Sequence, residues 1–193
     1  EKHYNNLTEQ SNHILSETDL IKGCINGDRQ MQKLLYQQFS SKMYGICLRY
    51  SENTEDANDI LQEGFIKVYK NLGKFRSEGS FEGWLRRIFV NTSIEHFRKK
   101  VKFYNVTEVQ ENTIEDNNID ALDSLATKDI MNMINQLSPG YKAVFNMHVI
   151  EGYSHKEIAD ILGITEGTSK SQLARSKGVL KKMLAARAEN PNN

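Results

Sequence analysis

The sequence predicts an all-α protein of two small helical bundles joined by an acidic linker, with a helix-turn-helix in the second bundle. Three observations lead to this prediction. Apolar residues recur at steps of three and four along most of the chain. No segment shows the period-two alternation that is typical of a strand. An Asn- and acid-rich stretch separates the two periodic regions. The 193 residues are enough for one or two ordinary domains.

The first bundle is expected to span residues 18–100, after an N-terminal tail, residues 1–17, that we expect to be disordered. Its helices are expected near residues 18–26, 29–50, 57–72 and 81–100. Asp28 suits the N-cap of the second helix, because its carboxylate can accept hydrogen bonds from free backbone N–H groups. Gly73 is expected to end the third helix, and Ser80 precedes the fourth.

Residues 101–122 differ in composition and are predicted to form an acidic, mostly irregular linker. The second bundle is expected over residues 123–187, with a C-terminal tail over 188–193. Ser138 and Pro139 predict the start of a helix in this bundle, since serine can cap it and proline suits its first turn.

The most specific local signal is a helix-turn-helix over residues 154–184. Ser154 and Glu157 have the spacing of a capping box, which opens a short helix. Gly163 stands where the chain needs a left-handed residue to turn, and Thr165 is expected to cap the following helix. Small Ala159 lets the two helices cross closely. The second helix is expected to place three leucines toward the core: Leu173, Leu180 and Leu184.

The charges are segregated although the formal net charge of the chain is zero. Residues 84–102 hold six bases and one acid, and residues 168–187 hold six bases and no acid. Residues 101–130 hold two bases and seven acids. Two basic helices separated by an acidic segment suit a chain that touches nucleic acid at two places. Two solvated helix faces are the alternative that charge alone leaves open.

The second helix of the helix-turn-helix is expected to present a polar face near its N-terminal end. In such motifs this end enters the major groove of DNA. Ser and Gln side chains can bind base edges or phosphates there, and Lys and Arg can bind phosphates or guanine. A helical hairpin that merely packs is the alternative. The candidate residues are Thr168, Lys170, Ser171, Gln172 and Arg175.

The segment from Phe75 to Lys100 is the second informative one. Aromatic residues surround a Gly/Ser loop, and the helix after it carries Arg and Asn outside its apolar stripe. Such a combination can hold an unstacked base and the neighbouring backbone. Core packing is the main alternative for the aromatic residues, and above all for Trp84.

No catalytic, metal or cofactor motif is found in the sequence. The five histidines form no HExxH or Cys/His cluster, and P-loop, GxSxG and GxGxxG motifs are absent. Cys24 and Cys47 lie in apolar-periodic segments, which predicts reduced thiols in the core. No apolar run could span a membrane, and the first twenty residues lack a secretory core. We therefore predict a cytoplasmic protein that is not an enzyme and holds no cofactor.

Three segments together resemble bacterial sigma factors of the extracytoplasmic-function (ECF) class. They are EDANDILQEGFIKVYKNLGKF, GSFEGWLRRIFVNTSIEHFRKK and LSPGYKAVFNMHVIEGYSHKEIADILGITEGTSKSQLARSKGVLKKML, and the resemblance covers roughly residues 18–187. It implies a subunit that binds the clamp and flap of core RNA polymerase, recognises the −10 and −35 promoter elements, melts the −10 region and directs transcription initiation. An anti-sigma factor is the regulatory partner expected from this class.

The resemblance also assigns residues by position. The helix that meets the clamp carries Asp59, Ile60, Gln62, Glu63 and Phe65. The loop and helix that would capture the −10 strand carry Phe75, Ser80, Phe81, Arg86, Arg87, Asn91, Glu95 and Arg98. The five polar residues of the helix-turn-helix, from Thr168 to Arg175, fall where the −35 duplex is read. The linker would thread the RNA-exit region of the polymerase.

The chain departs from the family pattern in the −35-reading helix. Gln172 and Ala174 are smaller and uncharged where the family pattern has a bulkier or basic residue. Gly178 weakens the helix by roughly 1 kcal/mol relative to Ala. These departures leave room for an accessory protein in promoter choice. Two other functions stay open: a DNA-binding regulator that uses only the helix-turn-helix, and a helical adaptor without nucleic acid. The docking helix near 56–69 and the basic loop and helix over 75–100 separate the sigma factor from the DNA-binding regulator, which needs neither.

Overall fold

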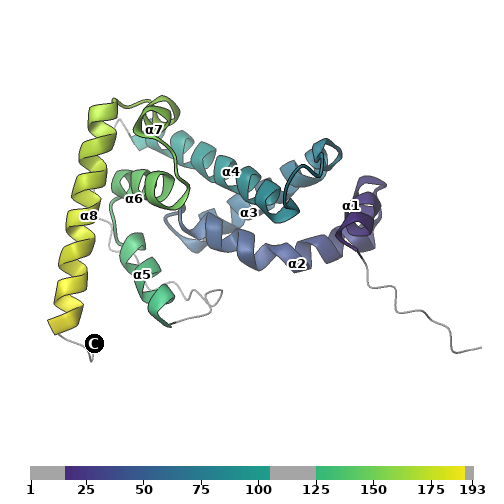
Figure 1. Cartoon of the computed structure of the whole chain (residues 1–193), viewed down its shortest axis with the longest axis horizontal. Helices are drawn as coiled ribbons and strands as arrows, with labels where there is room; N and C mark the ends of the chain where they lie inside the picture. Colours follow the sequence, from purple (N-terminus) through teal and green to yellow (C-terminus); the bar gives the residue numbers. More distant parts are fainter. Residues whose placement is uncertain (1–15, 105–124, 190–193) are drawn as a thin grey trace, which may run out of the picture.

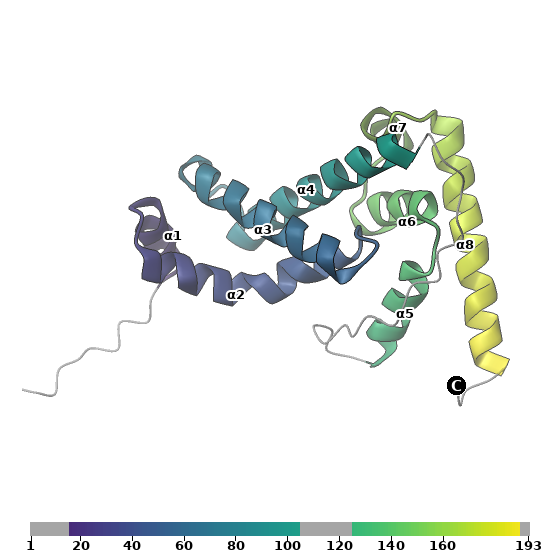
Figure 2. The ribbon, with the colours of Figure 1, turned by 180° about the vertical axis from the view of Figure 1, so that it is seen from behind.

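The computed structural model describes residues 16–104 and 125–189, and every regular element within these ranges is helical. The expected all-α class is therefore confirmed. The chain forms an elongated molecule, with α1 near one end and α8 across the other (Figures 1 and 2). No helix among the described residues has the length and apolar character needed to cross a bilayer.

The first bundle contains α1 (Glu17–Ile25), α2 (Arg29–Leu48), α3 (Thr54–Asn71), a 3-10 turn (Leu72–Lys74) and α4 (Phe81–Tyr104). Polar side chains cap its helices as the sequence predicts. The Asp28 carboxylate accepts from the backbone N–H groups of Gln30 and Met31. The Ser80 hydroxyl accepts from the backbone N–H of Gly83, at the start of α4.

The core of the first bundle lies between α2, α3 and α4. Its fully buried side chains include Leu35, Ile60, Phe81 and Phe89. Cys24 and Cys47 are buried free thiols, as predicted, and burial raises the pKa of the Cys47 thiol to about 12. Both cysteines therefore act as small apolar core residues.

Two helix ends of this bundle differ from the boundaries expected from the sequence. Gly73 lies inside the 3-10 turn and does not have the left-handed backbone of a glycine that ends a helix. The helix instead tightens into that turn after Asn71. Helix α4 continues to Tyr104, so residues 101–104 of the expected linker are helical. The rest of that linker and residues 1–15 of the tail that was expected to be disordered lie outside the described residues. The last two residues of that tail, Ser16 and Glu17, are the N-cap and first residue of α1, so the expected disorder is wrong for them.

The second bundle contains α5 (Leu125–Asn135), α6 (Pro139–Phe145), a π-helical turn (Asn146–Ile150), α7 (His155–Leu162) and α8 (Glu166–Glu189). Helix α8 packs against both α6 and α7 (Figure 1). Pro139 occupies the first turn of α6 as predicted, whereas the Ser138 side chain makes no capping hydrogen bond.

The local geometry of the helix-turn-helix confirms the prediction made from its sequence. The Ser154 hydroxyl accepts from the backbone N–H of Glu157 at 3.2 Å, and the Glu157 carboxylate accepts from that of Ser154 at 2.8 Å. Gly163 is left-handed with φ of 70°. The Thr165 hydroxyl accepts from the backbone N–H of Thr168 at 3.0 Å and so caps α8.

The predicted core face of α8 is correct only in its first half. Leu173 is buried, Leu180 is half-buried and Leu184 is 52% exposed. The reason is geometric, because α6 and α7 lie beside the first half of α8 and only α5 lies beside the second (Figure 2). A core prediction for Leu184 from periodicity alone is therefore wrong.

Candidate nucleic-acid and protein-docking surfaces

Helix α4 presents the first candidate surface. Arg86, Arg87, Asn91, Glu95 and Arg98 are all exposed. Four of them, from Arg87 onward, recur at steps of three and four and therefore share one face of the helix. The opposite face carries Leu85, Phe89 and Ile94 in the core. This face has the guanidinium and amide groups that bind phosphates and bases.

The aromatic residues at the start of α4 form a cluster. The ring centroids of Phe75 and Phe81 lie 5.2 Å apart, and those of Phe81 and Trp84 lie 5.7 Å apart in a stacked arrangement. Phe81 is fully buried, so its assignment as a DNA-contacting residue is corrected to a core support for the loop. Phe75 and Trp84 are half-buried and keep one side of the cluster accessible. Ser80 is exposed, and its hydroxyl is used to cap α4.

Much of the basic charge around α4 is paired inside the protein. Glu95 accepts from Lys67 at 2.9 Å and forms an ion pair with Lys99 at 3.1 Å. Hydrogen bonds from Lys67 and then Lys99 lower the pKa of the Glu95 carboxyl. Arg87 and Arg98 have no ion-pair partner within residues 16–104 and 125–189, so they supply the cationic character of this face. Glu95 is better placed to hold these lysines than to contact DNA.

Arg86 has a partner that sequence reasoning missed. Its guanidinium donates to the Glu151 carboxylate through Nε at 3.2 Å and Nη2 at 3.1 Å. Glu151 lies just before the helix-turn-helix, 65 residues away in the chain. No local pattern links two residues so far apart, and only the packing of the two bundles brings them together.

Helix α3 presents the second candidate surface. Asp59 and Gln62 are exposed, and Glu63 is half-buried with an ion pair to Lys67 at 2.8 Å. Ile60 and Phe65 are buried, so their assignment as polymerase-contacting residues is corrected to core positions. Sequence reasoning missed Ile66, which is 52% exposed on the same helix. Its spacing of four from Gln62 was the available signal, because it places both side chains on one face.

Helix α8 presents the third candidate surface. Lys170, Ser171 and Arg175 are exposed, whereas Thr168 and Gln172 are half-buried. The Gln172 side chain lies toward the start of α6, where a Cβ built on Gly140 would meet its amide nitrogen at 3.4 Å. Gln172 therefore borders the start of α6 while it keeps part of its side chain accessible, and its assignment to the DNA-reading face stays a prediction. The Ser171 hydroxyl donates to the Thr168 carbonyl at 2.9 Å.

Two residues that sequence reasoning passed over hold the helix-turn-helix together. The ring Nδ1 of His155 lies 2.9 Å from the hydroxyl of fully buried Ser169. The His155 and His148 rings stack with centroids 4.4 Å apart. Desolvation, followed by the neighbouring His148, lowers the pKa of His155. This contact links the start of α7 to the first turn of α8.

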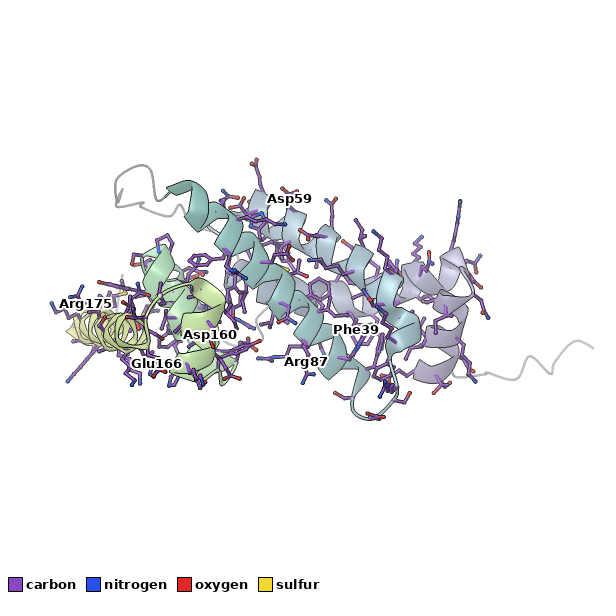
Figure 3. All side chains as sticks on the ribbon, turned by 90° about the horizontal axis from the view of Figure 1, so that it is seen from above. Phe39, Asp59, Arg87, Asp160, Glu166 and Arg175 are labelled. Atoms are coloured by element: carbon purple, nitrogen blue, oxygen red, sulfur yellow. The ribbon has the colours of Figure 1, made fainter. Side chains whose placement is uncertain are left out.

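The three surfaces lie far from one another. In Figure 3, Asp59 and Arg87 lie at opposite edges of the first bundle, and Arg175 lies at the far end of the second. No group of three metal-ligating residues is found in the part of the chain that the structure describes. The arrangement is that of a protein with several separate binding faces.

The comparisons with known proteins define the class. Residues 35–103 match the family model of Sigma-70 region 2, and residues 127–180 match that of Sigma-70 region 4. The ECF RNA polymerase sigma factor SigW of Bacillus subtilis is 30% identical over 176 residues, which are 85% of this chain and 94% of SigW. The RNA polymerase sigma-H factor of Pseudomonas aeruginosa is 26% identical over 183 residues, covering 87% of this chain and 93% of that factor.

A solved structure is also similar. The sigma factor RpoE of Bartonella quintana, crystallised with the anti-sigma factor NepR, aligns with a TM-score of 0.47 and 21% identity, covering 79% of this chain and 96% of RpoE. The sequence matches place the chain among the transcription initiation factors that carry Sigma-70 regions 2 and 4. Within them, the chain belongs to the ECF class of RNA polymerase sigma factors. The expected resemblance is therefore confirmed.

Proposed function

We propose that this chain binds core RNA polymerase, recognises the −10 and −35 elements of a promoter, melts the −10 region and so directs transcription initiation. The observation that carries the proposal is the separation of two cationic faces onto two bundles. The α4 face lies within the region 2 match, and the α8 face lies within the region 4 match. Two separated faces suit two separated DNA elements.

The α3 surface, made of Asp59, Gln62, Glu63 and Ile66, is proposed to dock on the polymerase clamp. It combines acidic, amide and exposed apolar side chains, which suits a protein partner better than DNA. The second bundle is proposed to bind the flap. Because RpoE of Bartonella quintana was crystallised with an anti-sigma factor, we propose that a protein of this class also regulates the present chain.

The decisive experiment is run-off transcription with purified core polymerase and promoter DNA. The chain should bind core and start specific transcripts. A chain that binds duplex DNA but neither binds core nor starts transcripts would instead be a conventional helix-turn-helix regulator. A chain that binds neither core nor DNA would be an adaptor.

Charge reversal on α3 separates core binding from DNA binding. The double change Asp59→Lys and Glu63→Lys should weaken core binding in a pull-down while the chain stays folded. Glu17→Lys with Glu78→Lys, an equal double charge reversal at exposed positions of the first bundle outside α3, is the matched control and should leave core binding unchanged. Equal loss in both variants would show that charge, and not the α3 surface, determines docking.

A further inference from the structure

The second bundle contains two stacked histidines that the proposed function does not use, and we call them the histidine pair. His148 lies in the π-helical turn, and His155 is the first residue of α7. Their rings are nearly parallel, with an interplanar angle of 9° and centroids 4.4 Å apart. Both side chains are half-buried. Histidine is the side chain whose ordinary pKa lies nearest to physiological pH, so this pair can change its charge when the pH falls.

A tight reversal of the backbone brings the two rings together. Gly152 adopts a left-handed φ of 79° within this reversal, between the π-helical turn and α7. The backbone N–H of Tyr153 donates to the carbonyl of Met147 at 2.9 Å. Nδ1 of His148 lies 2.8 Å from the carbonyl oxygen of Tyr153. Because a carbonyl oxygen only accepts hydrogen bonds, Nδ1 of His148 carries a proton, and its ring is held in place.

The ring of His155 reaches across to α8. Its Nδ1 lies 2.9 Å from the hydroxyl of Ser169, and Ser169 is 0% exposed. No other hydrogen bond of this hydroxyl is found within residues 16–104 and 125–189. A buried hydroxyl whose proton has no acceptor is destabilising, so the hydroxyl is the donor and Nδ1 is the acceptor. Neutral His155 therefore carries its proton on Nε2.

A second proton on the His155 ring is incompatible with this hydrogen bond. Protonated Nδ1 has no lone pair to accept from Ser169, and the buried hydroxyl proton is then left without an acceptor. The added charge also stands at the N-terminus of α7, where the helix dipole disfavours a cation. Because the ring is only half-buried, it can turn toward water once it is charged. Protonation therefore breaks the link between α7 and α8.

The charged groups around His155 favour its neutral form. His148 stacks on it from the π-helical turn, and a charge on either ring opposes a charge on the other. From α8, Lys170 and Lys177 oppose protonation, whereas Glu166 favours it. Desolvation first, and then His148 and the two lysines, lower the pKa of His155. The link is therefore intact at neutral pH and is lost only on acidification.

The link joins α7 to the part of α8 that carries the cationic face. Figure 1 shows that the start of α8 lies beside α7. Ser169 precedes Lys170 and Ser171, which are exposed on that face. Leu173 is buried and still holds α8 in the bundle when the link is lost. Loss of the link therefore loosens the first turns of α8 without unfolding the helix-turn-helix.

We propose that neutral His155 is a positioning residue for α8, and that protonation of the histidine pair loosens this helix and weakens −35 binding as the pH falls. The effect on DNA rests on the proposed function. The hydrogen bond from Ser169 to His155 concerns only the second bundle, and it can be measured in the full chain without DNA.

The first measurement follows the histidine pair by nitrogen NMR of the full chain from about pH 5 to pH 8. The neutral rings should be opposite tautomers, with the proton on Nδ1 in His148 and on Nε2 in His155. Ser169→Ala removes the donor that stabilises neutral His155, so it should raise the pKa of His155. His96→Gln, which removes a histidine of α4, is the control and should leave that pKa unchanged. A proton on Nδ1 of neutral His155, or an unchanged pKa in Ser169→Ala, would overturn the proposal.

The second measurement follows binding of a rhodamine-labelled −35 duplex by the chain in complex with core polymerase, at about pH 7.5 and pH 5. His155→Asn is the key variant, because Oδ1 of asparagine is bonded to Cγ as Nδ1 of histidine is, and it accepts a hydrogen bond at either pH. Wild type and His155→Asn should bind equally at the higher pH. At the lower pH, wild type should bind roughly three- to tenfold more weakly than His155→Asn. The ratio of the two affinities cancels the titration of core polymerase and of the other histidines.

Ser169→Ala is the complementary variant. It removes the link at every pH, so its affinity for the duplex should be reduced at both pH values, with no more pH dependence than His155→Asn shows. Circular dichroism of each variant checks that the helices are retained. Binding of Ser169→Ala that equals wild type at both pH values would contradict the positioning role.

Two further outcomes would also overturn the proposal. Equal binding by wild type and His155→Asn at both pH values would mean that protonation does not move α8. Tighter binding by wild type than by His155→Asn at the lower pH would mean that the charged ring attracts DNA phosphate directly. Failure of the proposed function would be seen separately, as the absence of core binding and of run-off transcripts while the tautomers of the histidine pair are as expected.

Discussion

Gly64 of α3 shows how one residue determines a helix crossing. A Cβ built at Gly64 would lie 2.2 Å from the ring of Phe89 on α4, and that ring is fully buried. Real Cβ atoms do not approach so closely, so either the ring or the helix must shift when a methyl group is added. The two helices that carry the α3 and α4 surfaces therefore owe their close packing to a missing side chain.

Gly64→Ala is expected to lower the free energy of unfolding by about 1–3 kcal/mol, since overpacking a closed core outweighs the better helix propensity of alanine. Urea denaturation measures the change. Gly178→Ala on α8 is the matched control, because nothing lies within 4 Å of its added Cβ. It should raise the free energy of unfolding by about 0.5–1 kcal/mol. A stabilising effect in both variants would contradict the close crossing.

Asn91 is a residue whose role is expected to concern DNA and not stability. Its side chain is exposed on α4 and lines a cleft of about 460 Å³ between α4 and the segment before α7. Asn91→Ala should change the free energy of unfolding by less than about 0.5 kcal/mol. It should slow opening of the −10 region, measured by the fluorescence of 2-aminopurine in promoter DNA, while core binding is kept. Gln30→Ala, exposed on α2, is the control that should open the promoter normally.

At the scale of elements, α8 combines a packing face and a cationic face along its length. Leu173, Ser169 and Ser176 are buried, and Lys170, Arg175 and Lys177 are exposed. Farther along, Arg187 pairs with Asp129 of α5 at 2.6 Å, so its charge is used within the bundle. Lys170 is 3.6 Å from Glu166 on the same helix, so Arg175 and Lys177 are the exposed cations near the turn that have no ion-pair partner among the described residues.

Arg175→Ala should weaken binding of the holoenzyme to −35 duplex DNA because an exposed guanidinium is lost. A base contact predicts a loss of about 1–3 kcal/mol that is confined to the cognate sequence. A phosphate contact predicts a similar loss on all sequences and a salt slope reduced by about 1. Fluorescence anisotropy at several salt concentrations separates the two. Arg187→Ala is the control: it removes the same charge from a site that is paired within the bundle, and it should leave DNA binding unchanged. Unchanged DNA binding in Arg175→Ala would contradict the assignment of Arg175 to the DNA-binding face.

Local patterns in the sequence were sufficient for most elements. Asp28, the Ser154–Glu157 capping box, left-handed Gly163 and the Thr165 cap all act between residues at most four positions apart, so the sequence contains their full description. Leu184 was mispredicted because the face that a helix buries depends on which neighbours reach it. Helix α8 is longer than the helices beside its first half, so Leu184 stays 52% exposed.

At the scale of the whole molecule, Lys142 should make stability depend on pH. Burial lowers its pKa to about 8 from the usual 10.5, so between these two values the unfolded chain binds more protons than the folded chain. Stability contributed by this group therefore rises with pH over that interval and is independent of pH below it. Raised pKa values of buried Tyr50 and Cys47 act in the opposite sense at high pH.

The comparison of wild type with Lys142→Met isolates this effect, because both chains share the other groups. The free energy of unfolding of wild type, relative to the variant, should increase between about pH 8 and pH 10 and stay constant from pH 6 to 7.5. Chemical denaturation at each pH measures it. A difference that does not vary with pH would mean that Lys142 is not buried as described.

The sequence by itself determined the helical class, the helix starts and turns, the segregation of charge into two basic helices, and the family. Each of these depends on residue types at short, fixed spacings. Only the tertiary structure decided which charges are free. It paired Glu95 with two lysines, moved Ile60, Phe65 and Phe81 into the core, and brought Glu151 onto Arg86. Except for the Glu95–Lys99 pair within α4, these outcomes depend on residues that are far apart in the chain, such as Lys67 with Glu95 and Arg86 with Glu151. The spacing of residues in a sequence does not specify which distant side chain will neutralise or cover another.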